Sequence, residues 1–249
     1  MSETDRRNGE LLEKIRAVHE ESDGTYGAPR VHQALKGTDS EAGLNRIARL
    51  MSENGIRSKI VKSFRKPEST DSRHRQPVFP NLLPDWALEK PNQIWVADIT
   101  YLRVEEEWGY LAAVLDLYSR RVVGWALGSS PDTELTLAAL RNALEVRGAP
   151  ELHHSDRGCQ YAAEAYRSEL KRFNIQGSMS RKGNCYDNAT MESFFGTLKT
   201  EKIFHERYSD LDELRRALFQ YIEMFYNTKR IHSSLGFVSP AALEEGFAA

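Results

Sequence analysis

The chain has 249 residues, of which 40% are hydrophobic and 28% are charged, and its formal net charge is −2. This composition is typical of globular proteins and excludes a wholly disordered chain, and no apolar run approaches the roughly 20 residues that cross a bilayer. The two cysteines are too few for a disulfide framework, and the charged first residues hold no signal-peptide stretch, so we expect a cytoplasmic, reduced protein.

Residues 1–56 contain three short patterns of apolar residues at helical spacing. The third pattern also carries two basic residues, Arg46 and Arg49, on its polar face. Three short helices with a basic last helix are typical of helix-turn-helix units, so we predict that this segment binds DNA through these two arginines; a plain helical bundle is the alternative. The apolar positions are Leu11, Leu12, Ile15 and Val18, then Val31, Ala34 and Leu35, then Leu44, Ile47, Ala48 and Met51.

Residues 57–92 have the composition of a basic linker. Five of the nine prolines lie here, and proline favours extended chain over packed elements. The chain beyond turns acidic, with 8 basic against 14 acidic residues in 81–170. A basic arm beside an acidic region fits a polyanion track next to a cation-binding site, and a solvated linker is the alternative. The basic residues of this arm are Arg57, Lys59, Lys62, Arg65, Lys66, Arg73 and Arg75.

Residues 93–206 read as an α/β layered domain with a mixed sheet. Their β-branched and aromatic runs predict an antiparallel meander of three strands, after which helices alternate with short strands. A further amphipathic helix is expected over 211–225, within a helical extension that spans 207–249. The expected strands are 94–104, 110–117, 121–127, 151–155 and 175–179, and the later helices of the domain are 135–148, 162–173 and 188–203.

Three carboxylates stand out in this domain. Asp98 lies inside an apolar strand, where a charge is costly unless it is paired or binds a metal. Asp156 follows a strand, at the end where α/β sheets tend to bind ligands, and Glu192 lies among apolar helix residues. From three separate elements they could converge on Mg²⁺, which prefers oxygen ligands, although each alone also fits a hydrogen-bonded or surface role. Lys199, seven residues after Glu192 on the same helix face, could hold a phosphate beside the metal.

Several joint motifs resemble one known family. The chain is similar to the second-frame product of insertion-sequence elements of the IS-three family, transposases of the DDE class related to retroviral integrases. The resemblance implies a ribonuclease H-like core whose catalytic triad is Asp98, Asp156 and Glu192, preceded by a helix-turn-helix segment. The matching stretches are TYGAPRVHQAL, RIARLMSENGI, WVADITYL, VLDLYSRRVVGW, HHSDRGCQY, SRKGNCYDNATMESFFGTLKTE and YNTKRIHSSLGFVSPAALE.

The resemblance also implies a mechanism and partners. Two Mg²⁺ or Mn²⁺ ions would be held per active site, with Asp98 on both, and water or a DNA 3′-OH would attack the phosphodiester. The partners would be element ends and target DNA. Lys199, Arg181 and Lys182 are candidates for phosphate contacts, and solvated side chains are the alternative for these three residues. We also expect a homo-oligomer on DNA, an upstream-frame product as a possible partner or fused segment, nucleoid association and no membrane contact.

Other functions are left open by the residues themselves. A ribonuclease H-like nuclease or resolvase that only hydrolyses DNA would use the same carboxylates, and a DNA-binding regulator would leave them idle. Zinc is disfavoured, because His153 and His154 point to opposite faces of a strand and no paired cysteines accompany them.

Overall fold

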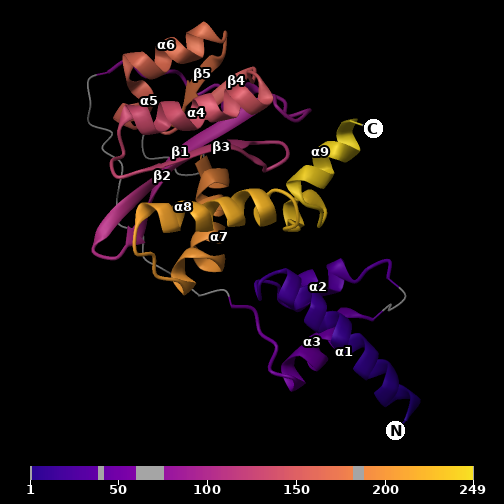
Figure 1. The fold of residues 1–249 in the computed structure, drawn as a ribbon. Helices are drawn as coiled ribbons and strands as arrows, with labels where there is room; N and C mark the ends of the chain where they lie inside the picture. The colour runs from indigo at the N-terminus through magenta and orange to yellow at the C-terminus, as the bar shows by residue number, and fades with distance from the viewer. Residues whose placement is uncertain (1, 39–41, 60–75, 182–187, 249) are drawn as a thin grey trace.

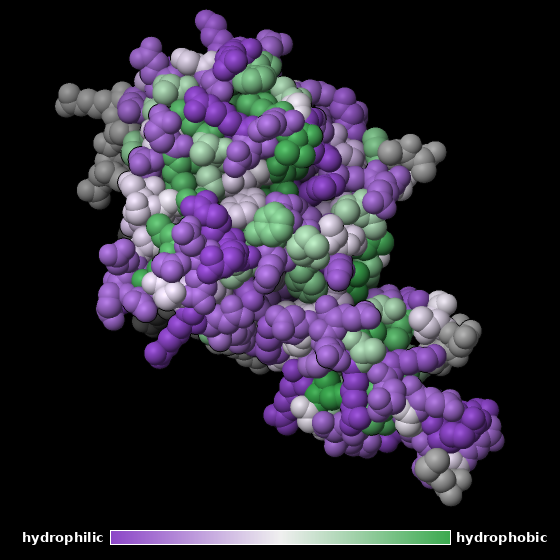
Figure 2. All heavy atoms as spheres, viewed as in Figure 1, coloured by the Kyte–Doolittle hydropathy of each residue, from purple (hydrophilic) through white to green (hydrophobic). Residues whose placement is uncertain are grey.

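A computed structural model describes residues 2–38, 42–59, 76–181 and 188–248 of the chain. Figure 1 shows a three-helix N-terminal part below a layered α/β part. A C-terminal helical segment packs beside the α/β part. Hydrophilic residues predominate over both parts on the face drawn in Figure 2. Among the described residues, no helix combines the length and the apolar character that a membrane span requires.

The three predicted N-terminal helices are confirmed as α1 (Glu3–Glu21), α2 (Ala28–Ala34) and α3 (Leu44–Glu53). A capping box between Ser2 and Asp5 starts α1, because each side chain accepts a hydrogen bond from the other residue's backbone. The helices enclose a small apolar core of their own. Its buried members are Leu11, Ile15, Tyr26, Val31, Leu35, Ala42, Ile47, Leu50 and Met51.

The α/β part is built on a mixed five-stranded sheet, as the sequence predicts. In the structure its strands lie in the order β3-β2-β1-β4-β5. The first three strands form the antiparallel meander, and β4 and β5 run parallel to β1. Each parallel connection contains helices, as a crossover between parallel strands requires. The strands are β1 (Ile94–Val104), β2 (Glu107–Asp116), β3 (Val122–Gly128), β4 (Leu152–Ser155) and β5 (Gln176–Met179).

Helices cover both faces of this sheet, as Figure 1 shows. Successive strand residues point to opposite faces, so Trp95 and Ala97 of β1 join one core while Val96 and Leu102 join the other. The first core packs under α4 (Thr133–Arg147), α5 (Cys159–Ala162) and α6 (Glu164–Arg172). The second packs under α7 (Ala189–Glu201), α8 (Leu211–Phe219) and the π-helix Gln220–Tyr226.

The structure differs from the sequence prediction in three helical regions. The helix expected over 162–173 is split, because Ala163 has extended backbone (φ −57°, ψ 144°) between α5 and α6. The helix expected over 211–225 changes to π-helical geometry after α8. Within the helical extension expected over 207–249, no bounds were predicted for the last helix, α9 (Pro240–Ala248), which is anchored by ion pairs of Glu244 with Arg121 and Arg147. Single 3₁₀ turns occur at Leu83–Asp85, Ile203–His205 and Ser233–Leu235.

The described part of the linker packs on the sheet. Phe79 lies against β5, where a Cβ on Gly177 would come within 2.5–2.6 Å of the Phe79 ring atoms. The backbone amide of Leu82 donates a hydrogen bond to the hydroxyl of Ser178. The chain is therefore fixed to the sheet before β1 begins. Of the basic arm, Lys62, Arg65, Lys66, Arg73 and Arg75 lie outside the described residues.

The contact between β3 and α4 leaves no room for a side chain at Gly124. A Cβ there would lie 2.6 Å from the backbone nitrogen of Ala143 and 2.7 Å from its Cβ. We therefore expect Gly124→Ala to lower the free energy of unfolding by about 3 kcal/mol in urea denaturation, because the helix must move off the sheet. The control is Gly9→Ala on α1, whose Cβ meets nothing within 4 Å; equal stabilities of the two variants would contradict the account.

Candidate active site

Asp98 and Asp156 stand side by side at the centre of the sheet. Strands β1 and β4 are parallel neighbours, and Ala97 pairs with Ser155. The residue that follows each of them along the chain is an aspartate, Asp98 within β1 and Asp156 just after β4, and neighbouring strands lie about 4.8 Å apart. The two carboxylates therefore lie next to each other at the same level of the sheet. Both side chains are partly exposed.

The two aspartates line one pocket of about 150 Å³. Burial raises the pKa of Tyr161 well above its usual value, and Tyr166 and the carboxylates of Asp98 and Asp156 add to the shift. Their joint effect on one phenol agrees with their shared position. The other lining residues are Ile99, Thr100, Tyr101, Tyr110, Pro131, Gly158, Cys159 and Gln160.

Backbone amides orient both carboxylates. Oδ1 of Asp98 accepts from the amide of Ile99 at 2.8 Å, and Oδ1 of Asp156 accepts from the amide of Gly158 at 2.9 Å. A Cβ on Gly158 would lie 3.0 Å from that same Asp156 oxygen. The glycine thus lets the backbone approach the carboxylate closely.

Glu192 lies one turn into α7 and does not line this pocket. Among the described residues, no three His, Cys, Asp or Glu side chains stand close enough together to hold a metal ion. The strand alternation nevertheless places Asp98 on the face of β1 that Val96 and Leu102 turn toward α7. The structure therefore brings two of the three predicted carboxylates together and places the third on the helix that packs on the same strand.

Lys199 connects α7 with the pocket. Its amine lies 4.5 Å from the ring centroid of Tyr101, which lines the pocket, in a cation–π contact. At 3.6 residues per turn, Glu192 and Lys199 are separated by only about 20° around the helix. The side of α7 that carries both residues is therefore the side nearest the pocket.

The other predicted DNA contacts lie in different surroundings. Arg181 is exposed beyond β5, and Lys182 lies outside the described residues. Arg46 donates to the Asn8 amide oxygen at 2.7 and 3.0 Å and so ties α3 to α1. Arg49 is exposed and pairs with Glu53 one turn along α3. Their role toward DNA stays a prediction.

The two histidines of β4 are both buried and hydrogen-bonded within the sheet layers. His153 Nε2 lies 3.0 Å from the hydroxyl of Tyr166, and burial lowers the pKa of His153 to about 3. His154 contacts the hydroxyls of Ser178 and Ser180 at 2.8 and 3.1 Å. Both rings thus have polar partners in the core, on opposite faces of the strand.

A second polar site was missed by the sequence analysis. Glu201, only 2% exposed, accepts from Arg230 at 2.7 and 2.8 Å, from Arg30 of α2 at 3.2 Å, and from the hydroxyl of Tyr221. This buried cluster joins the N-terminal helices to α7 and the C-terminal segment. Arg230 lies in the stretch YNTKRIHSSLGF, and no local spacing links it to Arg30 or Glu201.

Comparisons with known proteins cover nearly the whole chain. The family described as Integrase core domain matches residues 89–185, a second family of that description matches 174–240, and HTH-like domain matches 6–64. The insertion element IS600 uncharacterized 31 kDa protein of Shigella sonnei is 45% identical over 94% of this chain and 86% of its own length. Transposase InsF for insertion sequence IS3A of Escherichia coli (strain K12) is 42% identical over 92% and 80%.

The fold also has a counterpart among solved structures. A chain in the cryoEM structure of the simian T-cell lymphotropic virus intasome, in complex with PP2A regulatory subunit B56 gamma, matches with a TM-score of 0.54 at 17% sequence identity. The match covers 92% of this chain and 74% of that one. At this identity the similarity concerns the fold alone, and it agrees with the predicted ribonuclease H-like, integrase-type core.

Proposed function

The chain belongs to the insertion-sequence transposase family that includes InsF of IS3, and from this premise we propose that it cuts and joins DNA at the ends of an insertion sequence. The reaction is a phosphoryl transfer in which water or a DNA 3′-OH attacks a phosphodiester and releases a 3′ oxygen. The observation that carries the proposal is the adjacency of Asp98 and Asp156 in one pocket at the centre of an integrase-type sheet.

The donor set of this pocket fits a hard divalent cation. Mg²⁺ is commonly held by one or two carboxylates together with substrate phosphates and waters, and two aspartates line the pocket. We propose that Asp98 and Asp156 hold Mg²⁺ or Mn²⁺, and that Glu192 completes the set from α7. When bound, two such ions supply Lewis-acid activation of the attacking oxygen and charge stabilisation of the leaving oxygen.

The protein's own residues position the reactants. The amides of Ile99 and Gly158 fix the two carboxylates, so little reorganisation is needed when substrate arrives. Lys199, held over Tyr101, contributes a positive charge beside the pocket for the DNA backbone. We also propose that the protein acts as a multimer on DNA, since paired element ends need at least two active sites, and that an upstream-frame product assists it.

We expect Lys199→Ala to weaken DNA binding and to lower the slope of log affinity against log salt by about one, because one phosphate contact is lost. Fluorescence anisotropy with a labelled DNA duplex over a salt series measures both quantities. Lys90→Ala is the control, since Lys90 is an exposed lysine paired with Glu151 away from the pocket. An unchanged slope in Lys199→Ala would show that Lys199 is a surface lysine without a DNA contact.

The proposed function is tested with a labelled, pre-cut DNA end that bears a free 3′-OH, incubated with the chain and Mg²⁺ or Mn²⁺. Joined products are expected, because a pre-cut end needs only the strand-transfer step. Shortened products without joining would identify a hydrolytic nuclease instead. Binding without either product, in the presence of the upstream-frame product, would identify a DNA-binding regulator.

A further inference from the structure

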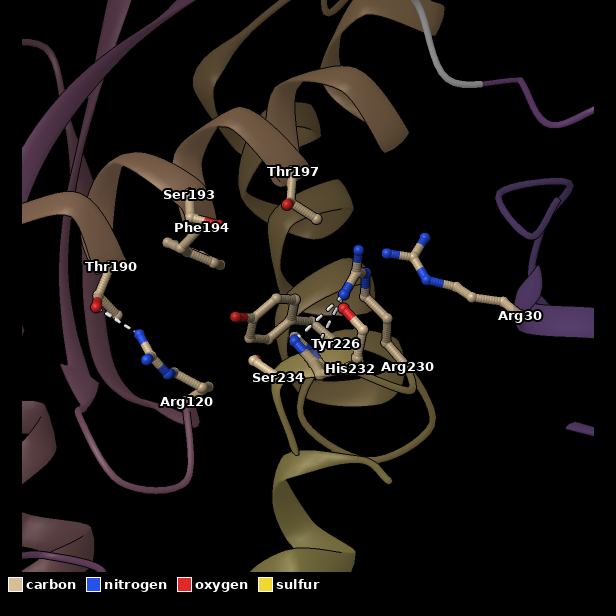
Figure 3. A pocket seen from close by; sticks show the side chains of 11 residues that line it. Arg30, Arg120, Thr190, Ser193, Phe194, Thr197, Tyr226, Arg230, His232 and Ser234 are labelled. Atoms are coloured by element: carbon tan, nitrogen blue, oxygen red, sulfur yellow. Dashed lines mark hydrogen bonds between the residues drawn. The ribbon is translucent and has the colours of Figure 1, made fainter. Parts of the chain in front are cut away.

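A second recess, of about 130 Å³, lies on the side of α7 away from the two aspartates. Figure 3 shows Arg120 reaching it from the turn between β2 and β3, Arg30 from the N-terminal helices, and Arg230 from the C-terminal segment. Hydroxyl groups complete the polar lining. These come from Thr190, Ser193 and Thr197 of α7 and from Ser233 and Ser234.

The recess has more positive than negative charge. Glu201 pairs with Arg230 and Arg30, whereas the Arg120 guanidinium donates to the hydroxyl of Thr190. Within the described parts of the chain, no carboxylate lies within ion-pairing distance of Arg120; Asp116, on the same turn, accepts its hydrogen bonds from Asn92 and Ser119. Three guanidinium groups thus face the recess, and one carboxylate pairs with two of them, which leaves an excess of two positive charges among these four groups.

The histidine in the recess does not add to this charge. Burial, and then the nearby charges of Arg230, Arg30 and Arg120, lower the pKa of His232 to about 3. The ring is therefore neutral at physiological pH, while the arginines remain protonated. Arginine forks and hydroxyl donors are the groups that bind phosphate oxygens in proteins.

The position of the recess on α7 suits a DNA strand. Around the helix, Thr190 and Thr197 lie nearly opposite Glu192 and Lys199, at about 100° per residue. The stripe between these two sides is open to solvent, so a strand crossing it reaches the pocket of the aspartates on one side and the recess on the other. The exposed residues of this stripe are small: Ala189, Ser193 and Gly196.

We propose that this recess binds a backbone phosphate of DNA between Arg120, the α7 hydroxyls and Arg230. The inference rests on the proposed function and adds to it a second anchoring point for the substrate. One phosphodiester held there fixes the strand relative to α7, and because Arg30 lines the same recess, it also couples the N-terminal helices to the bound DNA.

The test measures DNA binding without catalysis, in EDTA, with a fluorescein-labelled duplex and salt between about 50 and 200 mM. For Arg120→Gln we expect the log–log salt slope to fall by about 0.9, so that the unaltered chain loses about threefold more affinity than the variant over this range. Arg120→Lys restores the charge and is expected to restore most of the slope. The matched control, Arg172→Gln, removes an exposed arginine on α6 and is expected to leave the slope unchanged.

An unchanged slope in Arg120→Gln, or an equal fall in Arg172→Gln, would overturn the inference. Thermal unfolding with inorganic phosphate distinguishes the source of the anion. Stabilisation of the unaltered chain but not of Arg120→Gln, combined with an unchanged DNA slope, would mean a site for free phosphate and would also overturn it. If the salt slope falls in Arg120→Gln as expected but the unaltered chain gives no joined products, the result would count against the proposed function alone.

Discussion

Asp156→Asn is expected to abolish strand joining, with a loss on the order of 10³-fold or more, while DNA affinity stays within about twofold of the unaltered chain. The amide keeps the shape of the side chain and can still accept from the amide of Gly158, so the pocket is preserved. What is lost is a negative charge next to Asp98, and with it the divalent-cation binding that we propose for the pair. The measurement is the joining assay on a pre-cut end, together with anisotropy in EDTA.

The control for this prediction is Asp212→Asn, which makes the same change at an exposed carboxylate in the first turn of α8. It is expected to leave joining unchanged. If Asp156→Asn retained joining at the level of this control, Asp156 would have no part in the reaction.

Glu201→Gln is expected to lower the free energy of unfolding by about 3 kcal/mol, because it leaves the Arg230 guanidinium, whose side chain is 4% exposed, without its carboxylate. Arg30 and the hydroxyl of Tyr221 also donate to this carboxylate, and glutamine offers one acceptor oxygen where the carboxylate offers two. The glutamine has nearly the same volume, so the loss comes from charge and hydrogen bonding rather than from a cavity. Urea denaturation followed by circular dichroism measures the change.

Two further variants distinguish the stability contribution of the buried Glu201–Arg230 pair from that of an exposed ion pair. Glu53→Gln breaks the exposed pair with Arg49 and is expected to cost less than about 1 kcal/mol. Combining Glu201→Gln with Arg230→Met removes the uncompensated charge and is expected to recover much of the lost stability. A loss in Glu201→Gln as small as that in Glu53→Gln would contradict the assigned role of the cluster.

The strands and the long helices were predictable because their signals are local. The run 94–104 is rich in β-branched and aromatic residues and forms β1 over the same residues. The break at Ala163 and the π-helical continuation after α8 were not predictable, since neither is marked by proline or glycine and both depend on packing against the sheet. The short helix α9 depends on ion pairs of Glu244 with residues far away in the sequence.

In the candidate site, too, single residues could be predicted from local sequence, whereas the contacts between distant segments could not. Asp98 was identifiable as a charge in an apolar strand, Asp156 by its place after a strand and Glu192 as a charge among apolar helix residues, and the family resemblance implied that the three form one triad. The proximity of Asp98 and Asp156 depends on the pairing of Ala97 with Ser155, a parallel register between distant segments that no local pattern specifies. The Arg30–Glu201 pair spans 171 residues, so the recess of arginines emerges only from the folded chain.

We propose that Asp98, Asp156 and Glu192 act as one cation site on DNA. Electron paramagnetic resonance of Mn²⁺ measures this directly, by titrating the ion into the chain bound to a pre-cut DNA end and comparing Glu192→Gln and Asp156→Asn. We expect the unaltered complex to bind Mn²⁺ and both variants to bind it at least tenfold more weakly, since each loses a ligand charge. Binding by Glu192→Gln equal to that of the unaltered complex would exclude Glu192 from the site and contradict the claim.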